Sequence, residues 1–224
     1  MACLDDAAIR VLCELAHDGV WTVPQLEARR RRWNYPEIPP RLLNVSKGSL
    51  RPTGWSRTTV HVDIVRPAPA AVEIARARGV DATRVRVDHI EHAVGLADLR
   101  WRLGVSARSS ISGERLAIIQ TYRVSAGSGE FHRCPDAAYI FERGLVFCEY
   151  DTGRYSASQV REKIAAARFI RYFDGRRVVG HLWGAPTSVR GQWLKSHGVS
   201  SVAVIPSSSW LGREVSPSEL RFPR

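Results

Sequence analysis

Apolar positions recur every three or four residues at the start of the chain, which predicts two consecutive helices. The first runs from Asp5 to His17, and Gly19 is placed to end it. The second begins at Thr22–Gln25, which supplies an N-cap, a proline near the first turn and a capping-box glutamine. Two helices joined by a short glycine-containing turn are the opening of a helix-turn-helix.

The next segment is broken by prolines and predicts shorter elements. We expect a third helix over Arg41–Ser46, which would be the recognition helix. Arg57–Val65 alternates between apolar and polar residues, so it predicts a strand that would form a wing. A helix over Pro69–Arg78 follows. These elements predict an N-terminal winged helix-turn-helix domain at residues 1–80.

Residues 81–224 follow a different pattern, in which short apolar strands alternate with helices. Two apolar runs joined by Glu142–Gly144 predict a β-hairpin. A helix capped by Ser156 follows, and strands are predicted at Arg177–Trp183 and Ser201–Ile205 with a helix between them. The expected fold class is therefore α/β (α+β) with a mixed sheet.

The hairpin carries three acidic residues that we expect on one face. If Glu142 pairs with Leu145, Asp136 lies opposite Asp151, and Glu149 is two residues before Asp151 on the same side. A one-residue bulge in the turn would break this alignment. Converging carboxylates raise each other's pKa and favour a cation between them. Asp136, Glu149 and Asp151 are thus candidate ligands of a hard divalent ion such as Mg²⁺.

The order Pro135-Asp136, Glu149-x-Asp151 and Lys163 resembles the PD-(D/E)xK superfamily, which has the restriction-endonuclease-like fold. The resemblance implies a core of this fold at residues 81–224. It also implies a metal at the acidic residues and a role for Lys163 in steadying the phosphoryl oxygens during cleavage of DNA.

The third motif of that superfamily is usually Glu-x-Lys, whereas this chain has Glu149-Tyr150-Asp151. The departure resembles a subgroup with Glu-x-Asp-Gly that includes very-short-patch repair endonucleases and nuclease-like domains of some antitoxins. That subgroup has a helical glutamate before the first core strand, and Glu114 stands in this place. The resemblance implies that Glu114 is a further ligand or orients a water. A histidine that often follows in the subgroup is replaced here by Thr152–Tyr155.

A wider resemblance covers most of the chain. The segments HAVGLADLRWRL, GERL, CPDAAYIF and EYDTGR, followed by Lys163, are similar to the plasmid replication-relaxation family. The resemblance implies a winged helix joined to a nuclease-like domain. It also implies action on DNA in the replication, transfer or transcriptional control of a plasmid or mobile element.

The chain of 224 residues has a net charge of +11, with arginine in excess over lysine. This bias favours a polyanionic partner, here double-stranded DNA, although a surface that is basic throughout gives the same number. The arginine run favours phosphate contacts, and the region after it supplies candidate base contacts. The predicted DNA-contacting residues are Arg29, Arg30, Arg31, Arg32, Arg41, Asn44, Lys47, Arg51 and Arg57.

The sequence excludes some classes of function and leaves three open. It has no Gly-x-Ser-x-Gly elbow, no phosphate-binding glycine loop and no apolar run of membrane-spanning length. Four cysteines without metal spacing predict a reduced, cytoplasmic protein without a membrane partner. The candidates are a non-cleaving DNA-binding protein, a Mg²⁺-dependent DNA endonuclease using Asp136, Glu149 and Lys163, and an antitoxin-like regulator with a protein partner. A homodimer is also left open.

Overall fold

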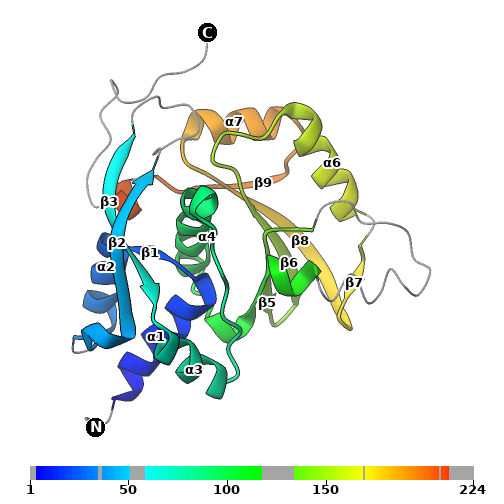
Figure 1. Cartoon of the computed structure of the whole chain (residues 1–224). Coiled ribbons are helices and arrows are strands. Elements are labelled where there is room, and N and C mark those ends of the chain that lie inside the picture. Colours follow the sequence, from blue (N-terminus) through cyan, green and yellow to red (C-terminus); the bar gives the residue numbers. More distant parts are fainter. Residues whose placement is uncertain are drawn as a thin grey trace. The chain divides into compact units, whose positions relative to one another are not determined.

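Figure 1 shows the computed structural model, which describes residues 4–34, 37–50, 59–117, 134–168, 170–206 and 208–211. The fold is mixed α/β and divides into two compact units between Asp98 and Leu99, with the segment from Pro206 belonging to the first. The division falls within a helix rather than near residue 80, because Ile90 and Val94 of that helix pack into the core of the first unit. Among the described residues, no helix is long and apolar enough to cross a membrane.

The first unit combines helices with a three-stranded sheet in the order β1-β3-β2 (Figure 1). Both neighbours of β3 run antiparallel to it. A 3₁₀ turn precedes β2 and another precedes α4. The elements are α1 (Asp6–Asp18), β1 (Trp21–Thr22), α2 (Val23–Trp33), β2 (Leu43–Leu50), β3 (Val60–Pro67), α3 (Pro69–Ala77), α4 (Ile90–Arg102) and α8 (Ser208–Leu211).

The predicted boundaries of the first two helices are confirmed by their caps. The carboxylate of Asp5 accepts a hydrogen bond from the backbone N–H of Ala8 at 2.6 Å, and Gly19 ends α1 with a φ of 77°. Thr22 and Gln25 form the predicted capping box at the start of α2. These local signals fix the ends of both helices, and the apolar faces between them pack into one core.

The third helix predicted over Arg41–Ser46 is wrong. A short 3₁₀ turn at Pro40–Leu42 is followed at once by β2, whose residues pair with β3 from Leu43↔Pro67 to Leu50↔Val60. The pairing strand outweighs a helical tendency that rested on only a few residues. The residues that were expected to form the recognition helix therefore begin a strand of the sheet.

The second unit is built on a mixed sheet in the order β4-β5-β6-β8-β7, with β9 also paired to β8 (Figure 1). β5 runs antiparallel to β4 and β6, whereas β6 and β9 run parallel to β8. The predicted capping box of Ser156 and Gln159 begins the helix after β6. The elements are β4 (Ser110–Ser112), β5 (Ala137–Phe141), β6 (Gly144–Tyr150), α6 (Ala157–Arg168), β7 (Tyr172–Phe173), β8 (Arg176–Ala185), α7 (Ser188–Ser196) and β9 (Ser201–Val204).

The hairpin of β5 and β6 has a different register from the predicted one. Phe141 pairs with Gly144, so the turn is Glu142-Arg143 and the pairing is displaced by two residues. Gly144 adopts a φ of 140°, and a Cβ atom there would clash with the carbonyl oxygen of Arg177. A displacement of two residues keeps every side chain on its predicted face.

Candidate functional site

A buried cluster in the second unit joins two carboxylates and one ammonium group. Asp136 precedes β5, Glu149 lies in β6, and the register places them opposite each other, one step beyond Ala137 and Cys148. The helix α6 brings Lys163 to the same place, with its Nζ 2.5 Å from Glu149 Oε2 and 3.6 Å from Asp136 Oδ1. The side chains of Glu149 and Lys163 are only 2% and 7% exposed, so the ion pair is formed away from water.

The backbone and the neighbouring charges hold this cluster in place. Asp136 Oδ2 accepts a hydrogen bond from the backbone N–H of Tyr150 at 2.8 Å, which fixes the carboxylate against β6. Burial raises the pKa of Glu149 well above its ordinary value, and the charge of Asp136 raises it further. Burial acts to lower the pKa of Lys163, but the two carboxylates outweigh it and raise that pKa. Lys163 is therefore a cation at neutral pH, and the carboxyl groups compete for a proton.

His181 of β8 extends the cluster, and the sequence interpretation did not single it out. Its Nε2 lies 3.7 Å from Glu149 Oε1. Burial, followed by the positive charge of Lys163, lowers the pKa of His181 to about 4, so its ring is neutral at neutral pH. The available signal was a histidine inside the apolar run VVGHLW, where a buried polar group needs a partner.

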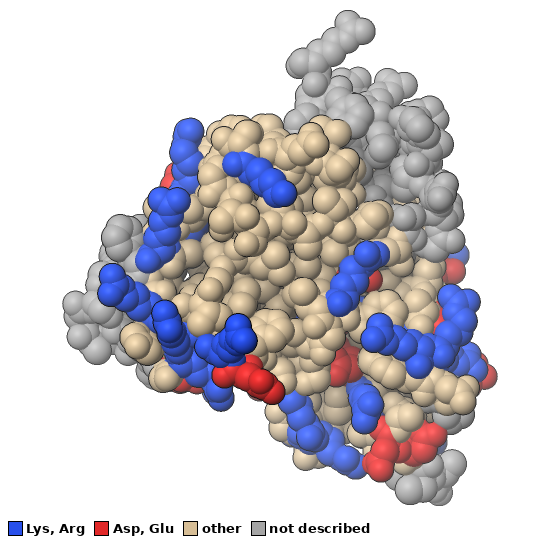
Figure 2. All heavy atoms as spheres, turned by 180° about the vertical axis from the view of Figure 1, so that it is seen from behind, with Lys and Arg blue, Asp and Glu red and all other residues tan. Residues whose placement is uncertain are grey.

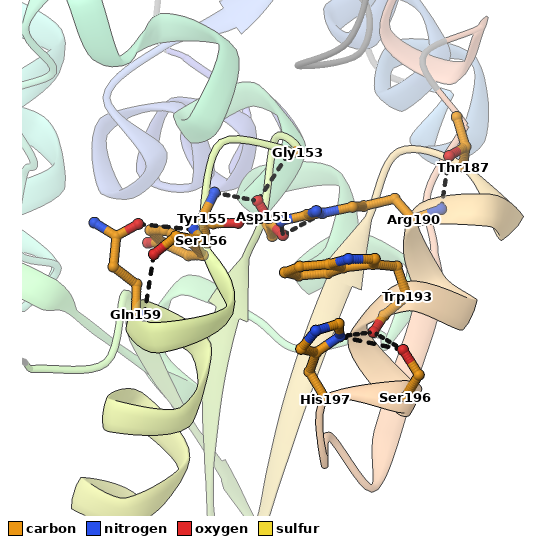
Figure 3. A network of polar contacts seen from close by, with 10 residues as sticks. All are labelled: Asp151, Gly153, Tyr155, Ser156, Gln159, Thr187, Arg190, Trp193, Ser196 and His197. Atoms are coloured by element: carbon orange, nitrogen blue, oxygen red, sulfur yellow. Dashed lines mark hydrogen bonds and ion pairs between the residues drawn. The ribbon is translucent and has the colours of Figure 1, made fainter. Parts of the chain in front are cut away.

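Asp151 does not join this cluster, so the predicted convergence of all three carboxylates is wrong. Figure 3 shows Asp151 facing Arg190 of α7, whose Nε and Nη2 lie 2.7 Å and 2.6 Å from Asp151 Oδ2. Asp151 Oδ1 accepts hydrogen bonds from the backbone N–H groups of Gly153 and Tyr155. β6 ends one residue before Asp151, so the alternation of the strand no longer sets its direction.

The ion pair of Asp151 and Arg190 connects the turn after β6 to α7. Both side chains are buried, at 1% and 3% exposure. Arg190 Nη2 also donates to the carbonyl oxygen of Tyr155 at 2.6 Å, and the guanidinium lies 3.6 Å from the ring centroid of Trp193 (Figure 3). With both carboxylate oxygens engaged, Asp151 has little capacity left to bind a metal.

Glu114 lies on the surface, in the helical turn at residues 113–117. The neighbouring Gly113 approaches the backbone of Asp136, which brings this turn close to the start of β5. Within the described residues, however, no hydrogen bond or ion pair connects Glu114 to the cluster.

The structure separates the predicted DNA-contacting arginines of α2. Arg29 is buried, with 1% exposure, and its guanidinium donates to the carbonyl oxygens of Gln25 and Ala97 and lies over the ring of Trp21. The predicted phosphate contact of Arg29 is therefore wrong, because the side chain is buried in the core of the first unit and hydrogen-bonded there. No local pattern indicates that Arg29 is buried, because the four arginines form one uniform run.

The other predicted contacts lie on the surface or outside the described residues. Arg30 is partly exposed and forms an ion pair with Glu27, whereas Arg31, Arg32, Arg41 and Asn44 are exposed. Lys47 is also exposed and pairs with Asp63 at 2.7 Å. Arg51 and Arg57 lie outside the described residues. Figure 2 shows Lys and Arg side chains distributed over the visible face, with smaller groups of Asp and Glu between them.

The cluster of Asp136, Glu149 and Lys163 fits a bound Mg²⁺ poorly in this arrangement. Carboxylate oxygens are the right donors, but Lys163 Nζ already lies against Glu149 Oε2 and near Asp136 Oδ1. The third predicted ligand, Asp151, is held by Arg190. In the described part of the chain, no three His, Cys, Asp or Glu side chains are grouped to hold a metal. The ammonium group of Lys163 supplies the positive charge beside Asp136 and Glu149 where a metal ion was expected.

Comparisons with protein-family models, with curated proteins and with solved structures found no match for this chain.

Proposed function

We propose that this chain is a double-stranded DNA-binding protein of a plasmid or mobile element, with a nuclease-like second unit that does not cleave DNA. The observation that carries the proposal is the exposure of Arg31 and Arg32 at the end of α2 and of Arg41 just before β2, in a chain of net charge +11. The motif resemblance to replication-relaxation proteins supports the biological setting. The ammonium group at the acid cluster favours binding without cleavage.

The hairpin of β2 and β3 is the proposed DNA-contacting element, in place of a recognition helix. The major groove of DNA accepts a two-stranded β-ribbon as well as a helix. Arg41 and Asn44 lie exposed at the base of this hairpin, and Arg31 and Arg32 lie exposed at the end of α2. The arginines supply phosphate contacts, and Asn44 is the candidate for contact with a base.

We expect the Arg31→Gln/Arg32→Gln variant to bind any DNA duplex more weakly than the unmodified protein. Each phosphate contact that is lost should reduce the slope of log K against log salt by about 0.9. The measurement is fluorescence anisotropy with a labelled duplex at several salt concentrations. Arg143→Gln, which removes an exposed charge from the β5–β6 turn, is the control. Equal salt slopes for all three proteins would contradict the proposal.

A Mg²⁺-dependent DNA endonuclease is the second candidate, because Asp136, Glu149 and Lys163 do converge. In that case Asp136 and Glu149 would hold the metal, which would activate a water, and Lys163 would have to leave Glu149. The close contact between Lys163 and Glu149 makes this the less favoured of the two functions.

Supercoiled plasmid incubated with the protein and Mg²⁺ or Mn²⁺ should stay supercoiled, as judged by gel electrophoresis. Nicking or linearisation that disappears in both Asp136→Asn and Glu149→Gln would establish the endonuclease instead. Both substitutions preserve side-chain shape while removing a negative ligand, so DNA binding should persist in the variants. Binding is measured on the same samples to separate loss of cleavage from loss of folding.

A further inference from the structure

A cavity of about 540 Å³ lies in the second unit, next to the acid cluster. It is an open cavity bordered by the end of α6, the β7–β8 hairpin and the segment between α7 and β9. His181 lines this cavity and also lies 3.7 Å from Glu149 Oε1. The volume is in the range of sites that bind small molecules or one unit of a polymer.

The charged residues that line the cavity are basic. Arg168, Arg171 and Arg177 contribute exposed guanidinium groups, and none of the three is paired with an acid in the described part of the protein. No aspartate or glutamate is among the described lining residues. Three arginines around one cavity attract an anion, and their planar donors match the oxygens of a phosphate.

Two ring nitrogens of lining residues have unused hydrogen-bonding capacity. His181 Nε2 and Trp183 Nε1 are buried and form no hydrogen bond with any described residue. Buried polar atoms nearly always have a partner, so exceptions of this kind call for an explanation. Because both residues line the cavity, a bound ligand is the explanation that we favour.

We propose that this cavity binds a phosphate group of a nucleotide chain, held by Arg168, Arg171 and Arg177. The ring of Tyr172 also lines the cavity and is 66% exposed, so it offers a surface on which the adjoining base can stack. A nucleotide uses both features, since it joins an anion to an aromatic face. The choice of a nucleotide rests on the proposed function, whereas the anion site rests on the cavity itself.

The test compares two neighbouring arginines of β8. Arg177 lines the cavity, whereas Arg176 is also exposed but is not among the residues that line it. The probes are an oligothymidine trinucleotide with a 5′-phosphate, the same trinucleotide without it, and inorganic pyrophosphate, measured by calorimetry on the full chain. Arg177→Gln should weaken binding of the phosphorylated probe about tenfold, the loss of one charge-assisted hydrogen bond. Arg176→Gln should leave binding unchanged, and Arg177→Lys should restore part of it.

The outcomes separate the ligand sources and the two proposals. Preference for the 5′-phosphorylated probe identifies a strand end, and equal binding of both trinucleotides identifies an internal phosphodiester. No binding of any probe, equal losses in the Arg176 and Arg177 variants, or full competition by an oligoglutamate peptide would each overturn the proposal. Because these probes are too short to form a duplex, they report on the cavity even if the DNA-binding role of the first unit fails.

Discussion

Replacing Arg190 by Met should lower the free energy of unfolding by about 3–5 kcal/mol, the usual cost of removing one partner from a buried ion pair. The substitution leaves the Asp151 carboxylate buried, and the partners that remain for it among the described residues are backbone N–H groups. It also removes the hydrogen bond to the carbonyl oxygen of Tyr155 and the stacking on Trp193. Urea unfolding followed by tryptophan fluorescence measures the loss.

Two further variants test whether the effect comes from the pair. Asp151→Asn/Arg190→Met removes both charges and should be more stable than Arg190→Met alone, because no unpaired charge remains buried. Arg161→Met, at an exposed position of α6, should change stability by about 0.5 kcal/mol or less. If Arg190→Met lowers the free energy of unfolding no more than Arg161→Met does, the ion pair of Asp151 and Arg190 does not stabilise the fold.

Local signals in the sequence predicted those parts of the fold that depend on a few adjacent residues. The capping residues Asp5, Thr22 and Ser156 each begin a helix close to where the pattern placed it. The strand β2 was missed because it is stabilised by pairing with β3, which comes later in the sequence. A strand of this kind becomes visible only when its partner is known, since its hydrogen bonds are not local.

Two of the three acidic residues of the candidate site were placed correctly from the sequence, and strand geometry explains both the agreement and the exception. The predicted register of the hairpin was displaced by two residues, an even number, which preserves the face of each side chain. The prediction that Asp136 and Glu149 share a face was therefore unaffected by this error. The prediction for Asp151 was wrong because this residue lies beyond the end of β6, where the alternation of side chains no longer applies. Its partner in the ion pair, Arg190, is distant in sequence, and no local pattern predicts a partner of this kind.

Lys163 should be as important to stability as Arg190, and its effect should depend on pH. It is the cation beside one buried and one half-buried carboxyl group, so Lys163→Met leaves Asp136 and Glu149 facing each other without it. We expect a loss of about 3–5 kcal/mol in the free energy of unfolding at neutral pH. Lys195→Met, which removes an exposed ammonium group from α7, is the matched control and should have little effect.

The direction of the pH dependence follows from the raised pKa of Glu149. The folded protein keeps a proton that the unfolded chain releases above the ordinary pKa of 4.5, so this contribution to stability is complete below 4.5 and is lost as pH rises through the folded value. Without Lys163, which lowers the pKa of Glu149, the folded value rises further and the loss with pH becomes larger. Urea unfolding at about pH 5 and about pH 8 should therefore show a smaller deficit for Lys163→Met at the lower pH. Adding Glu149→Gln to that variant should remove most of the pH dependence, because Glu149 no longer titrates. A deficit that is the same at both pH values would mean that Lys163 acts through packing rather than through its charge.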